Sequence, residues 1–439
     1  MKPSRRDRDR FVFWGSEAIM EIPYRSRSTL KEIIFVRHAE SQANLDGVWN
    51  GRTDGPLSSH GEESLDALGK RLSDWEYDVV VSSPLERAQK TARSFSTDFQ
   101  IDEDFTEIDL GRWEGMKREE IRAKHGDELD EAISSRTAPM GGTGESLAEA
   151  GRRALTAVDR LAESLGEDRK AVVVTHGGFL QAVLHRHMAG RDHRAHAFTS
   201  NTAITRVVWQ YGRPRLASFN DTGHFGPRSH LVEANLAEGN PVLALIRHGR
   251  TRANVEMRWQ GRGDWDLDDL GRRQAKALGD WYGQASIVYS SPLKRASSTA
   301  GYMAVNGVVA VDDLKEVSMG NWEGLTTAEI AERWPKELET IFREGVDLRR
   351  GETGESWGEL TSRVSNAVRG LKHAADEPTI VVAHGGAIRA YISSLTMTSD
   401  THAESLFTPA NTSVSHVAIT ERGPEILDYA VATHLESLE

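Results

Sequence analysis

The stretch IIFVRHAESQAN, residues 33–44, decides the architecture of this chain, because it returns as LALIRHGRTRAN at residues 243–254. In both stretches a short apolar run ends in an Arg-His pair, and an Asn follows the His at the same distance. A second histidine, followed by two glycines, also occurs twice, as His176 and His384, at nearly the same spacing. The chain is therefore a tandem duplication, and both halves contain both histidines.

Length and composition narrow the possible classes of protein. At roughly 100 to 200 residues per domain, 439 residues hold two to four domains, and the repeat selects two. Because the chain has no cysteine, disulfide bonds, thiolate metal ligands and cysteine nucleophiles are excluded. A net charge of −12 argues against a general binder of nucleic acid or anionic membranes. No apolar run approaches the roughly 18 residues of a membrane span. We expect a cytoplasmic protein with no nucleic-acid or membrane partner, and its oligomeric state stays open.

The repeat divides the chain into four parts. Residues 31–225 and 241–439 are each expected to form one domain, joined by a linker at 226–240 that has little hydrophobic periodicity. Residues 1–30 have a basic start but lack the apolar core of a signal peptide, and we expect them to form a flexible N-terminal extension. Each domain is then large enough to bury its own core.

Short apolar runs alternate with helical patterns in both halves. The apolar runs are 33–36, 79–81 and 171–174, then 242–246, 287–289 and 379–382; the helical patterns are 58–72, 84–93 and 145–165, then 268–282, 292–302 and 355–371. Ser83 and Pro84 are expected to supply the N-cap and first-turn proline of the helix after them. Continuous apolar strands between helices are typical of a mostly parallel sheet covered on both faces. The sequence therefore predicts an α/β fold with two tandem three-layer α/β/α sandwich domains.

Polar residues recur where the strands are expected to end. In open α/β sheets, ligands bind beyond the carboxyl ends of the strands. The recurring set is His38, Glu107 and His176 with Arg37, Asn44, Arg52 and Arg87 in the first half, and His248, Glu316 and His384 with Arg247, Asn254, Arg262 and Arg295 in the second. Since an unpaired buried charge costs several kcal/mol, a bound anion is the expected partner of the arginines.

These residue types suit the transfer of a phosphoryl group. Arginine forks bind phosphate oxygens bidentately and keep their charge, so they can neutralise a phosphoryl group without a metal ion. One histidine can attack phosphorus through a neutral ring nitrogen, and the second can donate to the equatorial oxygens. The carboxylate can protonate the leaving alkoxide and then take a proton from the attacking water. We therefore expect neither a cofactor nor a metal.

The ordered set of motifs resembles that of the histidine phosphatase superfamily, which has the phosphoglycerate mutase-like fold, over nearly all of residues 31–439. Each half contains Arg-His-x-x-x-x-x-Asn, Ser-Ser-Pro-Leu-x-Arg-Ala, a Glu before Gly-x-Trp-Glu-Gly, Gly-Glu-Ser and His-Gly-Gly, in that order. By this resemblance, His38 and His248 carry a phosphohistidine. Glu107 and Glu316 take the role of proton donor. The implied phosphate pocket consists of Arg37, Arg87 and His176 in one copy and Arg247, Arg295 and His384 in the other, with Asn44, Arg52, Asn254 and Arg262 lining it.

The departures from the family pattern are few. Ala39 replaces the usual glycine after the first Arg-His, and Arg250 stands where Glu is frequent; neither position supplies a reacting atom. The loop GRTDGPL at 51–57 differs from its counterpart GRGDWDL at 261–267. The two sites can therefore differ in the substrates they prefer.

The expected function is that of a metal-independent phosphatase with two sites, which hydrolyses small phosphorylated metabolites through a phosphohistidine. A phosphoglycerate-type mutase shares the first half-reaction, and one catalytic domain with one regulatory or binding domain is a further alternative. The segments between the Glu and the second His are short, whereas mutases of the family usually carry a longer insertion there that excludes water; this favours hydrolysis. Both copies keep the arginines, the nucleophile and the acid.

Two further groups of residues have a less specific meaning. A cluster of histidines follows the first His-Gly-Gly, at His185, His187, His193 and His196. Its spacing fits no tight ligand motif and the second half has no equivalent, so we interpret it as polar surface rather than a metal site. Tryptophans recur near the motifs at Trp49, Trp113, Trp259 and Trp322. The sequence leaves two roles open for these tryptophans, packing of loops and contact with a substrate.

Overall fold

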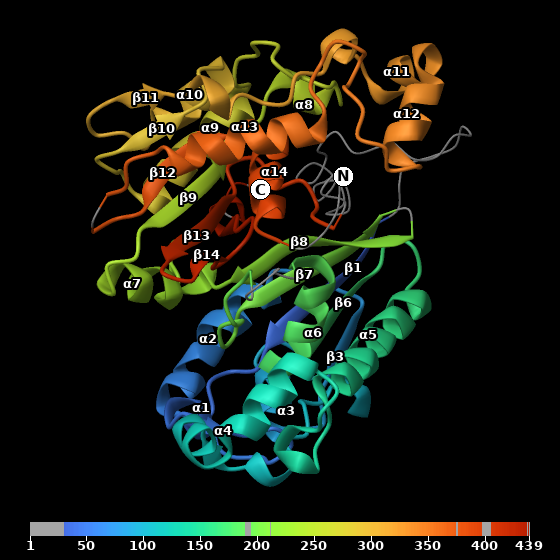
Figure 1. Ribbon diagram of the computed structural model, residues 1–439, viewed down its shortest axis with the longest axis vertical. Coiled ribbons are helices and arrows are strands. Elements are labelled where there is room, and N and C mark those ends of the chain that lie inside the picture. The colour runs from blue at the N-terminus through green and yellow to red at the C-terminus, as the bar shows by residue number, and fades with distance from the viewer. Residues whose placement is uncertain are drawn as a thin grey trace, which may run out of the picture. The chain divides into compact units, whose positions relative to one another are not determined.

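The computed structural model in Figure 1 describes residues 30–188, 195–210, 212–374, 376–396, 405–436 and 438. Its contacts divide the chain into two compact units. One contains Thr29–His187 and Phe198–Leu216, and the other contains Ala217–Glu439 and Met188–Ala197. The N-terminal extension expected at 1–30 lies, except for its last residue, outside the described residues. The domain bounds drawn from the repeat stay a prediction.

Each copy of the repeat forms a six-stranded sheet. The first has the order β4 (Gln100–Ile101), β3 (Val79–Ser82), β6 (Lys170–Thr175), β1 (Lys31–Arg37), β7 (Ile204–Gln210) and β8 (Arg213–Asp221). The second has the order β11 (Val308–Ala310), β10 (Val288–Ser290), β12 (Thr379–Ala383), β9 (Val242–Arg247), β13 (Val414–Thr420) and β14 (Gly423–Ile426). The first four strands of each order run parallel, and β7 and β13 run antiparallel to β1 and β9.

Helices flank both sheets, which confirms the predicted α/β class (Figure 1). In the first copy they are α1 (Gln42–Leu45), α2 (Ser59–Ser73), α3 (Glu86–Arg93), α4 (Arg118–Ser135), α5 (Leu147–Ser164) and α6 (Gly177–Met188), and a small sheet pairs β2 (Val48–Trp49) with β5 (Met116–Lys117). In the second they are α8 (Arg252–Val255), α9 (Asp269–Tyr282), α10 (Lys294–Ala300), α11 (Thr327–Arg333), α12 (Pro335–Phe342), α13 (Trp357–Arg369) and α14 (Gly385–Ser394). Several begin at side-chain caps, such as Ser58, which accepts a hydrogen bond from the backbone N–H of Gly61.

The helix after Ser83 begins later than the sequence predicts. The N-cap of α3 is Leu85 and that of α10 is Leu293, and neither makes a side-chain cap bond. Ser83 does not cap the helix, because its Oγ lies 2.6 Å from Nε2 of His176. The prediction of an N-cap serine is therefore wrong, and its cause lies in the functional site.

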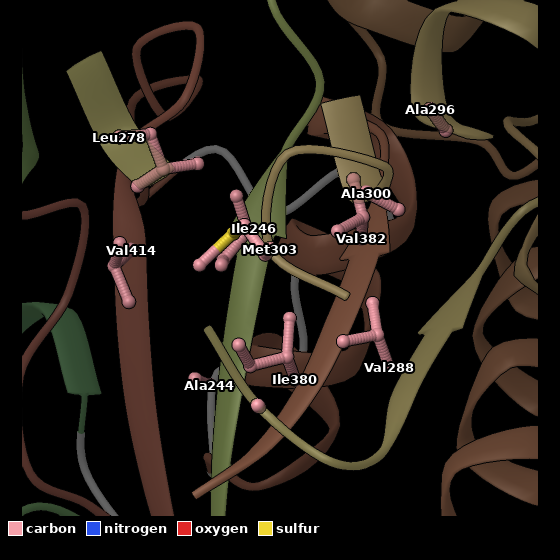
Figure 2. Packing of buried hydrophobic residues seen from close by; sticks show 11 residues of the cluster. Ala244, Ile246, Leu278, Val288, Ala296, Ala300, Met303, Ile380, Val382 and Val414 are labelled. Carbon is pink, nitrogen blue, oxygen red and sulfur yellow. The ribbon is translucent and has the colours of Figure 1, made fainter. Parts of the chain in front are cut away.

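The two copies build their cores from equivalent positions. In the first, Ile34 and Val36 of β1 pack in one buried cluster with residues of α2, α3 and β6. In the second, Ala244 and Ile246 of β9 occupy the same places, and Figure 2 shows Val382 of β12 in the same cluster. Because such cores are close-packed, they fix the strands that lead into each Arg-His pair.

The segment at 226–240, which the sequence predicts to be a linker with little hydrophobic periodicity, contains a helix. It contains α7 (His230–Ala237), which begins at the capping side chain of Ser229. Val232 is fully buried and packs in a cluster with Val242, Ala418 and Leu427. Hydrophobic periodicity misses this helix because it is short and presents few apolar residues to the core.

Candidate active sites

The strand order places the two histidines of each copy side by side. His38 directly follows β1 and His176 directly follows β6, and these two strands are paired in register. The ring centroids of His38 and His176 are 5.0 Å apart, and those of His248 and His384 are 5.1 Å apart. All four rings are buried. The fold therefore brings together the predicted nucleophile and its predicted partner in both copies.

One nitrogen of the first histidine is committed to the backbone. Nδ1 of His38 lies 2.7 Å from the carbonyl oxygen of Ala39, and Nδ1 of His248 lies 2.7 Å from that of Gly249. A carbonyl oxygen only accepts, so Nδ1 carries the hydrogen and Nε2 carries the lone pair of the neutral ring. Asn201 also donates from its side chain to the backbone oxygen of His38, at 2.9 Å. These bonds fix the ring and leave its lone pair on Nε2.

Burial and neighbouring arginines keep the histidines neutral. Desolvation, followed by the charges of Arg87 and Arg37, holds the pKa of His38 well below its usual value of 6.5. Desolvation is likewise the main cause that lowers the pKa of His176, His248 and His384 well below 6.5. A lone pair is therefore present on each ring at neutral pH, as nucleophilic attack requires.

The buried histidines predict a loss of stability in mild acid. Unfolding returns the four imidazoles to an ordinary pKa near 6.5, whereas the folded protein holds the pKa of each well below it. Below pH 6.5 the unfolded chain therefore binds protons that the folded chain does not. Each group should lower the free energy of unfolding by about 1 kcal/mol per pH unit. We expect the urea midpoint to fall between about pH 7 and pH 5.5.

A variant that removes two of these imidazoles supplies the control for this titration. The urea midpoint of His38→Gln/His248→Gln should fall less steeply with pH, since two fewer groups are linked to folding. Equal slopes for the variant and the parent protein would mean that other groups cause the acid sensitivity.

Two buried arginines in each copy supply the positive charge. Arg37 donates to the backbone oxygen of Thr199, and Arg87 donates to the backbone oxygens of Gly51 and Thr53 at 2.7 and 2.9 Å. Arg295 makes the same kind of contacts, at 2.7 and 2.8 Å, with Gly263 and Gly261. Burial lowers the pKa of Arg295 to about 10, so it stays charged at neutral pH. Arg87 also forms an ion pair with Asp54 at 3.3 Å. The backbone oxygens orient these guanidinium groups without neutralising them.

The predicted acid is held at the start of the helix that follows the second histidine. Glu107 accepts hydrogen bonds from the backbone N–H groups of Gly178 and Phe179 at 2.9 and 3.0 Å, and Glu316 accepts from Gly386 and Ala387 at 3.0 and 3.1 Å. A Cβ at Gly178 would lie 2.4 Å from Oε1 of Glu107, and one at Gly386 would lie 2.4 Å from Oε1 of Glu316. The second glycine of His-Gly-Gly therefore makes room for the carboxylate.

The loop arginines are paired with carboxylates. Arg52 forms an ion pair with Glu145 at 3.2 Å, and Arg262 forms one with Glu355 at 3.0 Å. The side chains of Arg52 and Arg262 are 46% and 41% exposed. They therefore differ from the buried arginines, and any contact with a bound anion would compete with these pairs. Asn44 uses its side-chain oxygen to accept from the backbone N–H of Ser41 within a capping box, as does Asn254 with Thr251.

The second copy has a partly open hollow beside His248. Five of its predicted site residues line it, namely Arg247, His248, Asn254, Arg295 and Glu316. The rest of the wall consists of Ala253, Met257, Arg258, Trp259, Gln260, Gly261 and Met319. Arg262 is absent from the lining residues.

Several residues that hold the site were not singled out from the sequence. Arg153 donates to the backbone oxygens of Asp104 and Thr106, both at 2.9 Å, and pairs with Glu145, so it braces the segment that carries Glu107. Glu114 accepts from the backbone N–H groups of residues 51–53. The other such residues are Asn201, Glu323, Arg363 and Asn411, and Ser83 and Ser291, which the sequence placed in a motif without this role, also support the site. All of them recur in both copies, and this recurrence is the signal that could have found them.

The histidine cluster after the first His-Gly-Gly is polar surface only in part, since His185 is exposed. His187 and His196 are both buried, since the ends of α6 and of the following segment pack into the protein. His193 lies outside the described residues. Among the residues that are described, no group of three His, Asp or Glu side chains is arranged to hold a metal ion. Trp113 and Trp322 are fully buried, which identifies them as packing residues.

Comparison with known protein families agrees with this geometry. A model of the histidine phosphatase superfamily, branch 1, matches residues 33–222 and again residues 243–432. The chain belongs to this superfamily. Within the described residues no helix has the length and apolar character needed to cross a bilayer.

Relatives of this histidine phosphatase include enzymes of known activity. The metal-independent phosphoserine phosphatase of Arabidopsis thaliana is 34% identical over 215 residues, which are 47% of this chain and 87% of the relative. A glucosyl-3-phosphoglycerate phosphatase of Mycobacterium tuberculosis is 35% identical over 165 residues, which are 35% of this chain and 74% of the relative. The solved structure of a mycobacterial glucosyl-3-phosphoglycerate phosphatase is 28% identical with a TM-score of 0.38, covering 44% of this chain and 99% of that one. The family match and the two sequence relatives support the conclusion that the chain is a phosphatase of the histidine phosphatase type.

Proposed function

We propose that this histidine phosphatase hydrolyses small-molecule phosphomonoesters at two sites, without a metal ion, through phosphohistidines on His38 and His248. The main support for this proposal is the contact of Nδ1 in His38 and His248 with a backbone oxygen at 2.7 Å. Because Nδ1 carries the hydrogen, the lone pair of the neutral ring is on Nε2, beside buried arginines. Both copies contain the full set of groups. This favours two active sites over one catalytic and one regulatory domain.

The reaction proceeds in two displacements at each site. Nε2 of His38 attacks phosphorus, the N–P bond forms, and the ester P–O bond breaks while Glu107 gives a proton to the departing alkoxide. Water then attacks phosphorus and gives a proton to Glu107, and the N–P bond breaks to release inorganic phosphate. Arg37 and Arg87 stabilise the charge on the equatorial oxygens in both steps. His248 and Glu316 take the same roles in the second copy.

The relatives support hydrolysis of a small phosphorylated metabolite rather than mutase activity. The enzymes named above act, by their names, on phosphoserine and on glucosyl-3-phosphoglycerate. The segment between Glu107 and His176 contains β5, α4, α5, β6 and two short 3-10 helices, and it belongs to the same compact unit as the rest of the first copy. Water can then reach the phosphoenzyme, as hydrolysis requires.

The two sites are proposed to differ in specificity. The cavity wall of the second copy includes Met257, Arg258 and Gln260, where the repeat aligns Gly47, Val48 and Asn50 in the first. Arg258 is held by Glu256 and Glu329 at 2.8 and 3.2 Å. At the second site, the polar side chain of Arg258 in the wall favours substrates with polar leaving groups. At the first site, Val48 stands at the aligned position, and its side chain offers no hydrogen bond.

Trapping of the covalent intermediate tests this function. Brief reaction with a phosphate-labelled aryl ester, followed by alkaline quenching, should label peptides that contain His38 and His248, and the label should be lost in acid because the P–N bond is acid-labile. Turnover should be unaffected by a metal chelator. A label that survives acid, or activity that a chelator abolishes and a metal restores, would contradict the proposal.

A further inference from the structure

Ser83 and its counterpart Ser291 occupy a buried position directly beside the second histidine. Oγ of Ser83 lies 2.6 Å from Nε2 of His176, and Oγ of Ser291 lies 2.8 Å from Nε2 of His384. Each hydroxyl also accepts a hydrogen bond from the backbone N–H two residues later, at 3.3 Å in both copies. Both serines are fully buried. The same arrangement in both copies indicates a selected contact rather than chance packing.

The hydrogen-bond inventory decides which atom donates in this contact. A serine hydroxyl has one hydrogen to give, and the backbone N–H of Leu85 cannot receive it. Among the described residues, the acceptor within reach of the Ser83 hydroxyl is Nε2 of His176. A buried hydroxyl without an acceptor is costly, so Ser83 donates and Nε2 accepts. The neutral ring then carries its single hydrogen on Nδ1.

The other ring nitrogen has the environment expected of an unused donor. Nδ1 of His176 is buried and has no hydrogen-bond partner among the described residues. The ring that carries it lies 5.0 Å from that of the nucleophile His38, measured between centroids. A buried N–H without a partner beside a nucleophile suits a transient ligand with acceptor oxygens, and the phosphoryl group is such a ligand.

We propose that Ser83 and Ser291 are positioning residues that set the tautomer of the second histidine, so that its Nδ1–H donates to an oxygen of the phosphoryl group. This inference rests on the proposed function. In the opposite tautomer, the lone pair of Nδ1 would face an anionic oxygen, and an attractive charge-assisted bond would become a repulsion. The serine thus acts on the transition state through the histidine, without touching substrate.

In the second copy, a second hydrogen-bond donor competes with the serine for the ring of His384. Nε of Arg295 donates to Nδ1 of His384 at 3.2 Å. A neutral imidazole accepts at one nitrogen only, so Ser291 and Arg295 cannot both donate to it. Ser291 favours the tautomer with hydrogen on Nδ1, and Arg295 favours the other. When a phosphoryl group occupies the site, Arg295 can turn to its oxygens and Ser291 then determines the tautomer.

The two copies should therefore respond differently when the serine is removed. In Ser83→Ala no group remains that selects a tautomer of His176, and both forms should coexist. In Ser291→Ala the contact from Arg295 holds His384 in the wrong tautomer before the phosphoryl group binds, and no serine hydroxyl then restores the other form. We expect kcat to fall about 10-fold for Ser83→Ala and up to about 100-fold for Ser291→Ala, each with little change in KM.

Each measurement uses the full chain with one live site. Ser83→Ala and Ser83→Thr are compared in the His248→Ala background, and Ser291→Ala and Ser291→Thr in the His38→Ala background. Threonine keeps the hydroxyl and should restore most of kcat, whereas a packing defect would be made worse by its extra methyl group. Thermal unfolding of each variant separates a folding defect from a catalytic one.

Nuclear magnetic resonance of protein labelled with 15N-histidine supplies a readout that packing alone would not move. Two-bond nitrogen–proton correlations should show His176 protonated on Nδ1 in the parent, a mixture of both forms in Ser83→Ala, and recovery in Ser83→Thr. Protonation on Nε2 in the parent, or unchanged spectra and kcat in both alanine variants, would overturn the inference. Because the spectra need no substrate, they decide it even if the proposed phosphatase activity fails.

Discussion

The double variant His38→Ala/His248→Ala is expected to lose at least about a thousand-fold in turnover of any phosphomonoester that the protein hydrolyses. Under the proposed mechanism, each alanine removes the ring nitrogen that attacks phosphorus in its copy. The second histidine is not expected to substitute, because its Nε2 lies 2.6 or 2.8 Å from a serine hydroxyl. Water could still attack a bound ester, but without a nucleophile held beside the arginines. Release of inorganic phosphate from an aryl phosphate measures the loss.

The single variants assign this activity to the copies. His38→Ala should keep the turnover of the second site, and His248→Ala that of the first, with substrate preferences that differ between them. His125→Ala is a matched control, since His125 is a partly exposed histidine of α4 whose ring contacts Glu128 at the surface. A double variant that retains activity would show that neither histidine is the nucleophile. A single variant as inactive as the double would leave one copy without catalysis.

Replacing the carboxylates should produce a loss that depends on the leaving group. Glu107→Gln in the His248→Ala background is expected to lower kcat for an alkyl phosphate by about 100-fold to 10,000-fold. An alkoxide needs a proton as it departs, and glutamine has none to give. A nitrophenolate needs no such help, so turnover of p-nitrophenyl phosphate should fall far less in the first step. The ratio of the two rates therefore reports proton donation rather than folding.

The hydrogen bonds to the Glu107 carboxylate provide a control for the variant Glu107→Gln. Glu107 accepts from the N–H groups of Gly178 and Phe179 with different oxygens, at 2.9 and 3.0 Å. The glutamine amide group would turn one of these contacts into two facing donors. Glu107→Asp keeps the charge but shortens the side chain, so it should lower kcat for both esters to a similar extent. Equal losses on both esters in the glutamine variant would argue that Glu107 only shapes the site.

The sequence was sufficient for the parts of the site that lie on regular elements. Arg37 and His38 end a buried strand, and His176 ends its neighbour, so parallel pairing brings them together whatever the loops do. The repeat made the prediction possible. A single match of residue types is weak evidence for a site, whereas the same ordered set of residues in two copies is strong evidence. The contacts of Arg52 could not be predicted from the sequence, because its partner Glu145 is distant in the chain and both residues belong to loops.

The start of the helix after Ser83 shows why local rules fail at such a site. A serine before a proline and a helical pattern satisfies the local signature of an N-cap. The side chain instead serves His176, a partner more than ninety positions away, and the helix begins at Glu86 without a capping side chain. Tertiary contacts outweigh local propensity wherever a polar group has a buried partner. The helix α7 was missed for a different reason, its shortness.

The glycine beside the acid bears on how a duplicated enzyme can lose one of its halves. A methyl group at Gly178 would lie 2.4 Å from Oε1 of Glu107, and one at Gly386 would lie 2.4 Å from Oε1 of Glu316, so the carboxylate would have to move although no histidine, arginine or glutamate had been replaced. Under the proposed mechanism, such a copy would keep its phosphate-binding residues while its proton donor was displaced. One copy could therefore lose activity through a substitution outside its set of reactive residues.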